Sequence, residues 1–540
     1  MTDQGTAGIT ATRGMTRRQC LRGMGLLATG AALVGPLGGL RSAHAQETPV
    51  KGGIFNFNLT ASPPNFDPLS NSSGTILSCI APCYSGLVRF DPMDPNAIVG
   101  DAAKEWAVSD DGKTFTFRLH DNIRFHDGQP LTSADAAFSL DRIANPPQGV
   151  ASNRKEALAV IDSMAAPDPL TLVITLKRPS PAFLNTLASG WMVILAKHFI
   201  DAGGDPATTV MGSGPFKFKE YIEGVSVELE RNPDYFIADR PYLDGIKGYI
   251  IPDQGAVWNY LQSGQLQQWQ SIQGAEAGQY ASDDQIEIVE TPSTSMIGVT
   301  FNTTVAPFDN PVVREAACLA IDRAAGMEIL QRGQGVFGGP IVPGPWTLPP
   351  ATLEAIAGYG LDPAANLERA KALMAEAGLS EELEVRMLVR RIALFEPVGV
   401  FLKDQWAKIG INVILDVQEN ATFFESQSKR AFQALVAGGS ANTSDPDDVG
   451  AWYRCGSSQN FADLCNSGAD AIFDQMSAES DPAKRKALAN EWEAMTAEGR
   501  GTFIMYWRKR FMGLRRNVHG LIIHPNIDNN MKHQDVWLSV

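Results

Sequence analysis

Residues 383–418 have the sequence LEVRMLVRRIALFEPVGVFLKDQWAKIGINVILDVQ, and the fold class follows from its hydrophobic pattern. Apolar residues alternate with other residues in two runs, with the period of a half-buried strand: Leu383, Val385, Met387 and Val389, then Ile411, Val413, Leu415 and Val417. The residues from Phe395 to Ile409 predict a helix that ends at Gly410. Two strands joined by a crossover helix pair in parallel, with a right-handed connection. This stretch therefore predicts an α/β fold.

The flanking residues extend the same pattern in both directions. Before it, we expect a helix that is capped by Asn366 and ends at Gly378. After it, we expect a short helix and a further strand over residues 432–437. Residues 366–440 thus predict an α/β lobe of their own.

The loop after the last of these strands is the first candidate for ligand contact. In open α/β sheets, ligands bind beyond the carboxyl ends of the strands. Residues 438–446 begin with two glycines, which allow close approach of the backbone, and continue with polar side chains. From this loop we take Asn442, Ser444 and Asp445 as ligand-binding candidates. The alternative is a solvated turn rich in Asn and Asp.

Other elements are predicted nearer the N-terminus. Residues 53–59 predict a first strand, and the loop after it supplies Thr60 and Ser62 as further ligand candidates. Thr132 and Asp135 have the spacing of a capping box that opens a helix. Two strands over residues 216–222 and 225–230, joined by Glu223 and Gly224, predict a hairpin, and alternating apolar residues predict a half-buried strand over 115–119.

Residues 1–45 have the pattern of a cleaved twin-arginine export signal. Arg17 and Arg18 precede a weakly apolar stretch over residues 23–40, and small residues at Ala43 and Ala45 suit a signal peptidase. Cleavage would leave Gln46 as the first residue. The alternative is a membrane anchor, which Pro36 and the many glycines disfavour. Export places the mature chain in the periplasm.

The amino-acid composition limits the kinds of molecule that the protein can bind. The 540 residues are 44% hydrophobic, ample for a large core, and carry a formal net charge of −15. Nucleic-acid binding requires a basic surface, so we expect no nucleic-acid partner.

The cysteines predict one disulfide. Cys455 and Cys465 flank a polar loop and are the best candidates in an oxidising compartment. Cys79 and Cys83 lie four residues apart in a predicted helix, which disfavours a bridge; they fit buried thiols better than a metal site. Cys318 falls in an apolar helix and is expected in the core.

Enzyme and cofactor motifs are weak or absent in the sequence. Residues 333–338 match GxGxxG, but a predicted helix precedes them and prolines follow them, the wrong context for a dinucleotide site. The histidines show no zinc-binding spacing. We therefore expect no catalytic residue, cofactor or metal. Among the tryptophans, we expect Trp106, Trp406 and Trp492 in the core, and take Trp191 and Trp258 as possible cleft residues.

Several motifs, in order and spacing, resemble family 5 extracellular solute-binding proteins, which bind dipeptides, oligopeptides or nickel for ABC importers. They are YSGLVRFD at 84–91, WAVSDDGKT at 106–114, IRFHDGQPLTSAD at 123–135, FSLDR at 138–142, GSGPFKF at 212–218, NPDYF at 232–236, FNTT at 301–304 with PF at 307–308, and VR at 313–314 with IDR at 321–323. The resemblance covers nearly all of the mature chain.

The resemblance implies a two-lobed periplasmic binding protein-like fold of the large type II class, with an extra subdomain in the first lobe and a hinge. Lobe I would comprise residues 46–300 and 513–540, and lobe II residues 301–512. Asn302 would lie near the hinge and cleft. A monomer would bind a small solute and deliver it to an ABC permease and its ATPase.

Two departures from the peptide-binding pattern bear on the ligand. Where peptide-binding relatives carry a Trp and an Asp that holds the ligand amine, this chain has Gly439 and Asn442. An Asn can hydrogen-bond an ammonium but cannot pair its charge. No arginine lies between residues 333 and 356 to bind a dipeptide carboxylate, and Arg332 is the nearest. A peptide or peptide-like ligand remains the main expectation, with an oligosaccharide, an opine or a metal chelate as alternatives, and an enzyme or a chaperone-like or signalling receptor as the more distant ones.

Overall fold

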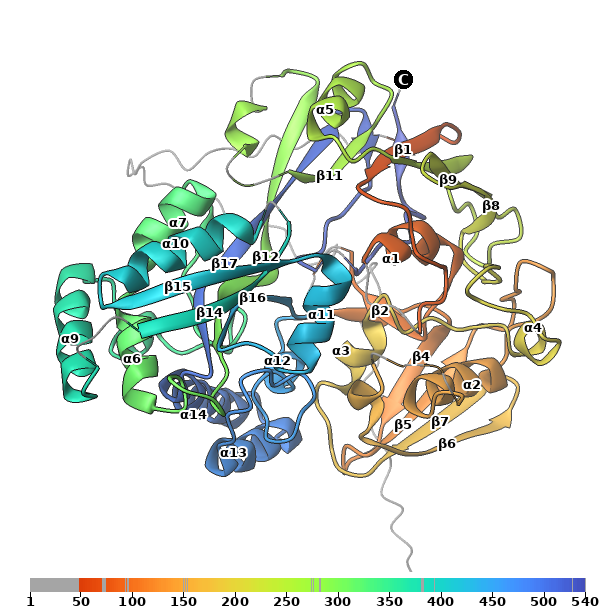
Figure 1. Cartoon of the computed structure of the whole chain (residues 1–540). Coiled ribbons are helices and arrows are strands. Elements are labelled where there is room, and N and C mark those ends of the chain that lie inside the picture. Colours follow the sequence, from red (N-terminus) through yellow and green to blue (C-terminus); the bar gives the residue numbers. More distant parts are fainter. Residues whose placement is uncertain are drawn as a thin grey trace, which may run out of the picture. The chain divides into compact units, whose positions relative to one another are not determined.

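The predicted strands of residues 383–440 form a parallel part of the main sheet in this computed structural model. Strands β14 (Leu383–Arg390), β15 (Ile411–Gln418) and β16 (Ala434–Ser440) lie in the order β15-β14-β16, and β14 is parallel to both neighbours. Helix α10 (Glu396–Ala407) connects β14 to β15 and packs against both (Figure 1). The alternating Val385, Met387 and Val389 are fully buried, as the period predicted. The α/β prediction is confirmed.

The structure describes residues 48–69, 74–92, 94, 97–148, 150, 152, 154–272, 274, 276–280, 283–379, 383–392, 394–526 and 528–539; at 420 and 421 it describes only the backbone. Residues 49–540 form one compact unit, separate from residues 1–48. The predicted export signal at 1–45, with its cleavage site before Gln46, lies outside the described residues.

Two local predictions in this region are wrong in detail. Helix α9 spans Pro363–Glu376, and its N-cap is Asp362, whose side chain accepts a hydrogen bond from the Ala365 amide. Asn366 lies inside the helix and donates to the Gly360 carbonyl. A proline at the first helical position favours the earlier start, because its missing N–H is one that the helix leaves unpaired. Strand β16 continues to Ser440 because residues 438–440 pair with residues 295–297, so the loop begins at Ala441.

Two long antiparallel strands join this parallel region to the rest of the main sheet. They are β12 (Ile286–Phe301) and β17 (Thr502–Arg515), which run side by side through the middle of Figure 1. Their register shifts between Pro292 and Met296, and short β13 (Gly335–Val336) pairs with β17. Beyond β17 the sheet continues with β11 (Gln268–Ile272), β1 (Ile54–Leu59), β10 (Gly245–Ile250), β9 (Ser226–Arg231) and β8 (Phe216–Ile222).

The β8–β9 pair confirms the predicted hairpin, with Gly224 at φ +71° in its turn, a conformation that glycine adopts without strain. A separate four-stranded sheet has the order β4 (Ala103–Val108), β5 (Thr114–Leu119), β7 (Thr171–Leu176) and β6 (Ile161–Asp168). Helix α2 (Ser133–Ala144) opens with the predicted capping box of Thr132 and Asp135.

The remaining elements connect and cover these sheets. They are α1 (Gly74–Ile80), η1 (Ala81–Cys83), β2 (Val88–Phe90), β3 (Ile98–Gly100), η2 (Glu156–Leu158), α3 (Phe183–Ala188), α4 (Lys197–Asp201), α5 (Gln254–Gln262), η3 (Ala277–Gln279), α6 (Pro311–Leu319), α7 (Arg323–Gln331), α8 (Pro350–Glu354), α11 (Asn420–Ser428), α12 (Asp447–Gly450), α13 (Ser467–Ala478), α14 (Pro482–Gly499), β18 (Val518–His519) and β19 (Trp537–Leu538). None of the helices within the described ranges is long and apolar enough to cross a membrane.

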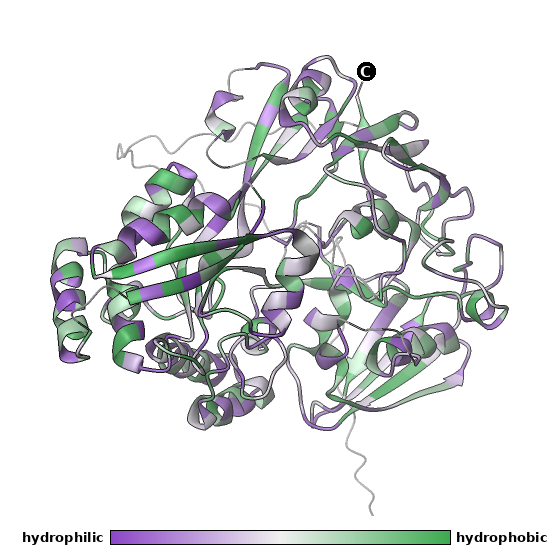
Figure 2. Cartoon of the chain, viewed as in Figure 1, coloured by the Kyte–Doolittle hydropathy of each residue, from purple (hydrophilic) through white to green (hydrophobic). Residues whose placement is uncertain are grey.

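The hydrophobic core is divided into clusters. One lies wholly within residues 297–506, a second within 69–196, and a third combines residues 55–246 with 518–536. Cys318, Trp406 and Trp492 are buried as predicted. Trp106 is only half-buried, because it lies on the edge strand β4. Outer helices such as α9 carry both hydrophobic and hydrophilic residues (Figure 2).

Candidate functional site

Three distant segments meet at the loop that follows β16. The Ala441 carbonyl accepts hydrogen bonds from Thr294 Oγ1 at 2.6 Å and from Asn526 Nδ2 at 2.7 Å. The Asn442 carbonyl accepts one from Asn529 Nδ2 at 3.1 Å. The loop predicted to contact ligand thus lies against the long strand β12 and against the C-terminal segment 524–529.

The three candidates from this loop have different environments. The Asn442 side chain is exposed and that of Ser444 is half-buried. Asp445 is 5% exposed, and both of its carboxylate oxygens accept from Arg485, at 2.7 and 2.8 Å. Asn185 Nδ2 lies 3.4 Å from Asp445 Oδ2. Asp445 therefore holds the loop in place, and Asn442 is the side chain best exposed to a solute.

Two further aspartates follow in helix α12. Ser477 Oγ donates to Asp447 at 2.6 Å, and Thr443 Oγ1 donates to Asp448 at 2.5 Å. Burial raises the pKa of Asp447 to about 6, with the Asp445 charge adding to the rise. Burial likewise raises the pKa of Asp448 to about 6. The base of the loop is therefore acidic and largely removed from solvent.

Trp191 belongs to a buried polar centre. Its side chain is 2% exposed, and its Nε1–H donates to Asp528 Oδ2 at 3.0 Å. The guanidinium carbon of Arg154 lies 3.5 Å from the centre of the indole ring, in cation–π geometry. Asp528 Oδ1 is buried without a hydrogen-bond partner among the described residues, and burial raises the pKa of this carboxyl. Trp191 is therefore a buried residue held by Asp528 and Arg154, and its ring is not exposed for a solute to stack on.

Two cavities border this centre. One, which is partly open to solvent, is lined by residues of 81–101, 188–193 and 520–536, Asp528 among them. Inside it, Lys532 Nζ is 2.5 Å from Asp101 Oδ1. A smaller cavity is lined by Arg154 and Trp191 together with residues of 68–69, 139–143 and 193–195.

The other candidates lie apart from the loop. Ser62 Oγ accepts from the Gly224 amide at 3.1 Å, beside the β8–β9 turn, and Thr60 is exposed nearby in sequence. Asn302 is 2% exposed, and its Nδ2 donates to the carbonyls of Arg430 and Phe432. Trp258 is half-buried, with its ring centroid 4.6 Å from that of Tyr280. Within the part of the chain that the structure describes, no hydrogen bond joins these side chains to the loop at 441–446.

Two site residues that sequence reasoning missed lie on β17. Arg508 and Arg510 are half-buried, and Arg510 Nη2 donates to the Gln270 carbonyl at 3.1 Å. Asp528 and Arg154 were missed as well. The available signal was the pair of alternating arginines within a strand that is otherwise largely apolar, FIMYWRKRFMGL at 503–514.

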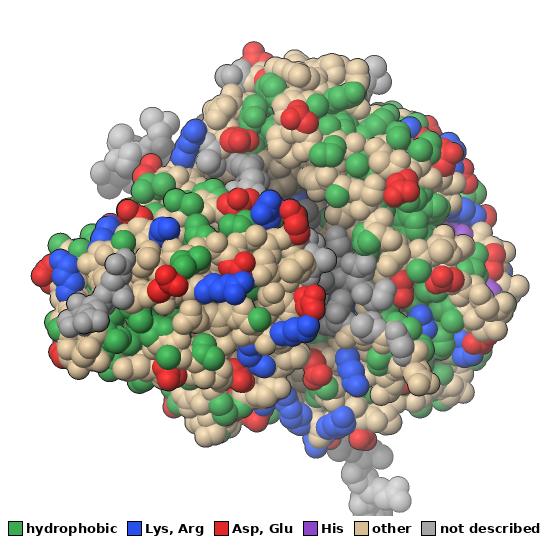
Figure 3. All heavy atoms as spheres, in the orientation of Figure 1, with side chains coloured by type: hydrophobic (Ala, Val, Ile, Leu, Met, Phe, Trp, Pro, Cys, Tyr) green, Lys and Arg blue, Asp and Glu red, His purple; other side chains and the backbone are tan. Residues whose placement is uncertain are grey.

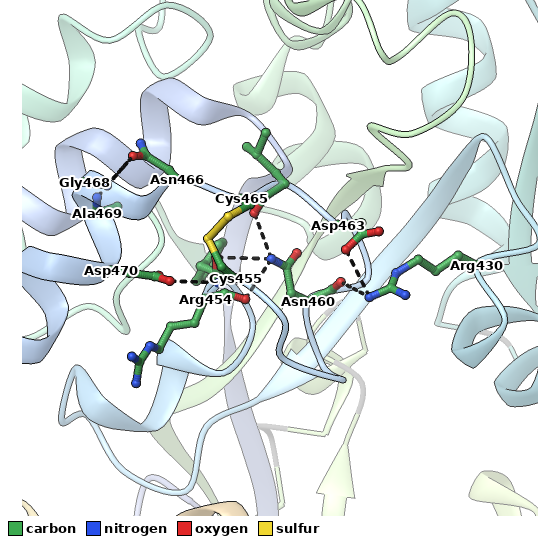
Figure 4. Close-up of a disulfide and its surroundings, with 12 residues drawn as sticks. Arg430, Arg454, Cys455, Asn460, Asp463, Cys465, Asn466, Gly468, Ala469 and Asp470 are labelled. Carbon is green, nitrogen blue, oxygen red and sulfur yellow. Dashed lines mark hydrogen bonds and ion pairs between the residues drawn. A yellow bond between two sulfur atoms is a disulfide. The ribbon is translucent and has the colours of Figure 1, made fainter.

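The cysteines pair as the sequence suggested. Cys455 is joined to Cys465 by a disulfide, with their Cα atoms 4.6 Å apart (Figure 4). Asn460 Nδ2 contacts the carbonyls of Tyr453, Arg454 and Leu464, which closes the loop between the cysteines. Cys79 and Cys83 are buried free thiols, and burial raises the pKa of Cys79 to about 12.

The surface charges and the titratable side chains bear on the kind of ligand that the protein can bind. On the face shown in Figure 3, Lys and Arg are interspersed with Asp and Glu. Among the described residues, no three His, Cys, Asp or Glu side chains are grouped so that they could hold a metal ion. The charged and hydrogen-bonding side chains around Asn442 and Asp528 are suited to binding a polar solute.

Comparisons with known proteins agree on one family. Residues 97–461 match the family model described as the middle part of bacterial extracellular solute-binding proteins, family 5. The dipeptide-binding protein of Escherichia coli (strain K12) is 25% identical over 496 residues, which are 86% of this chain and 91% of that protein.

Solved structures show the same fold. The periplasmic binding protein AgaA from A. tumefaciens R10, in complex with agropinic acid, has a TM-score of 0.79 at 25% identity, over 90% of this chain and 99% of that one. The binding protein DppA of Helicobacter pylori, in complex with the peptide STSA, has a TM-score of 0.80 at 22% identity, over 91% and 99% of the two chains. The two-lobed type II fold predicted from the sequence is confirmed.

Proposed function

Because the chain belongs to the family 5 bacterial extracellular solute-binding proteins, we propose that it is the solute-binding component of an ABC importer. It binds a peptide or peptide-like solute between its two lobes and delivers it to the permease, whose ATPase supplies the energy. The observation that carries this proposal is the meeting of loop 441–446, strand β12 and the C-terminal residues Asn526 and Asn529, beside the half-buried Asp528.

In this proposal the lobes are residues 46–300 with 513–540, and residues 301–512. This division is supported by the hydrophobic clusters, one of which is confined to residues 297–506 while another joins residues 55–246 to 518–536. Strands β12 and β17 run through both proposed boundaries, so they form the hinge. A solute that contacts both lobes shifts the equilibrium toward the closed form, which the permease recognises.

Export and assembly complete the proposal. Arg17 and Arg18 direct the precursor to the twin-arginine pathway, and cleavage after Ala45 releases a periplasmic monomer. A lysine pair in place of the two arginines should retain the precursor in the cytoplasm. The protein performs no catalysis; binding without turnover is the expected behaviour.

The ligand class has one favoured alternative. Asn442 is exposed but neutral, so it cannot form an ion pair with a peptide amine as a carboxylate would. In addition, the structural relative AgaA was solved in complex with agropinic acid. These observations favour a non-peptide solute, such as an opine, as the second candidate. An oligosaccharide or a metal chelate has less support.

A thermal-shift screen tests the proposed function. The purified mature chain is heated with di- to pentapeptides, opines, oligosaccharides and metal chelates. A ligand at a hundred times its dissociation constant stabilises the folded state by about 2.7 kcal/mol, which appears as a clear rise in Tm. Turnover of a stabilising solute, or the absence of any shift throughout the screen, would contradict the proposal.

A further inference from the structure

Two arginines lie on one face of the hinge strand β17. Arg508 and Arg510 are two residues apart, so their side chains leave the same face of the sheet. Their Cα atoms are separated by about 7 Å, the length of two residues in a strand. Thr291 of β12 lies opposite Arg510 in the register and therefore on the same face. Lys509 leaves the other face and is paired there with Glu290 at 2.7 Å.

Each of the three side chains on this face has one buried polar atom without a hydrogen-bond partner among the described residues. The Nε atoms of Arg508 and Arg510, and Oγ1 of Thr291, are buried without a hydrogen-bond partner among the described residues. Burial lowers the pKa of Arg510 to about 10 and also lowers that of Arg508. An unpaired buried polar group costs free energy, and an uncompensated cation costs more. Each such group requires an explanation, and a bound solute that supplies the missing partner is one.

The two arginines differ in their acidic neighbours. Asp528 is the carboxylate near Arg510 and Arg154, and it already accepts a hydrogen bond from Trp191. Within the described residues, Arg508 makes no ion pair. Arg154 and Arg510 are the guanidinium groups that act on the Asp528 charge, and Arg508 lies on the same face of β17 as Arg510. Both β17 arginines lie on the proposed hinge strand, where a solute would contact both lobes.

We propose that Arg508 and Arg510 form a subsite for a carboxylate of the transported solute, and that Asp528 Oδ1 accepts a donor of the same solute. This inference rests on the proposed binding function and narrows the ligand to carboxylate-bearing compounds. The planar guanidinium suits bidentate binding of a carboxylate. The carboxylate is either the C-terminus of a peptide or the acid group of another organic acid. These arginines supply the cation that residues 333–356 lack.

The experiment compares free acids with their amides. Di- to pentapeptides and small organic acids are each paired with the corresponding carboxamide, and neutral oligosaccharides are added as a third arm. Binding is measured by thermal shift and then by calorimetry for the wild type, Arg508→Gln, Arg510→Gln and the two Lys variants. The control is Arg516→Gln, an exposed position on the same segment. The peptide and organic-acid arms distinguish the two sources of the carboxylate.

We expect free acids to bind and amides to fail. Each Gln variant should bind the free acid about tenfold or more weakly, because a charge-assisted hydrogen bond is lost. The Lys variants should keep part of the wild-type affinity, and Arg516→Gln should keep all of it. Without ligand, the Gln variants should melt at or above the wild-type Tm, because each substitution removes a half-buried charge; a purely structural role would lower the Tm.

Other outcomes separate the two proposals. An amide that binds as tightly as its acid, Gln variants that bind unchanged, or shifts with neutral oligosaccharides alone would overturn the carboxylate subsite and leave the binding function standing. No shift with any compound in the three arms would overturn both.

Discussion

Arg485 donates to both carboxylate oxygens of Asp445, at 2.8 and 2.7 Å, and both side chains are about 95% buried. Helix α14 thereby holds the loop that follows β16, across 40 residues of sequence. This contact constrains the backbone on which Asn442 is presented.

Breaking this pair should strongly destabilise the fold. Asp445→Asn removes the bidentate partner of the buried Arg485 and leaves it only the longer contact with Asp447, at 3.5 Å, which costs about 3–5 kcal/mol. Urea unfolding measures the change. Asp404→Asn removes an exposed carboxylate 3.8 Å from Lys408 and should cost less than about 1 kcal/mol. The double variant Asp445→Asn with Arg485→Met should regain part of the loss; equal stability of Asp445→Asn and wild type would contradict the assignment.

Glu493 should make stability depend on pH. Its side chain is fully buried and accepts from the amides of Leu348 and Ile341, and burial raises its pKa from 4.5 to about 7. The folded state therefore keeps a proton that the unfolded chain releases. The stabilisation is complete below pH 4.5 and is lost as the pH rises to about 7, by up to about 3 kcal/mol.

Comparison with Glu493→Gln isolates this effect. The variant does not titrate at this position, so its stability relative to wild type should rise between pH 4.5 and pH 8. Urea unfolding at both pH values measures the difference, and Glu491→Gln, at an exposed neighbouring position, is the control. A difference that does not change with pH would contradict the raised pKa.

The disulfide should stabilise the loop between α12 and α13. Cys455 and Cys465 are 10 residues apart. A disulfide that closes a loop of this length lowers the entropy of the unfolded chain, which raises the free energy of unfolding by about 2–3 kcal/mol. Cys455→Ser with Cys465→Ser should lower the free energy of unfolding by that amount. Reduced wild type should behave in the same way. Mass spectrometry of a non-reduced digest that finds both thiols free would refute the bridge.

Asn442→Ala should weaken solute binding and change the stability of the ligand-free protein little. The side chain is exposed, and the hydrogen bond from Asn529 goes to the backbone carbonyl, which the substitution keeps. Calorimetry with the best solute from the screen measures the dissociation constant. Asn259→Ala, exposed on α5, is the control. An unchanged dissociation constant would remove Asn442 from the site.

The sequence alone determined the features that depend on local periodicity and spacing. Alternation at period two located β14, β15 and β5, the residues Thr132 and Asp135 located the start of α2, and Glu223 with Gly224 located a hairpin turn. These signals lie within a few residues of one another, so no distant contact is needed to interpret them. Asn366 failed as a cap because Asp362, followed by a proline, starts the helix earlier.

Only the tertiary structure decided which side chains form the site. Trp191 meets Asp528 across 337 residues, and Asp445 meets Arg485 across 40. Trp191 and Asp445 are thereby buried with partners, while Arg508 and Arg510 lie on β17 with their Nε atoms unpaired among the described residues. The pairing of β12 with β17 and the docking of the C-terminal segment set these contacts. Both depend on the packing of the whole core, and a local pattern carries no information about which distant segment will fill that space.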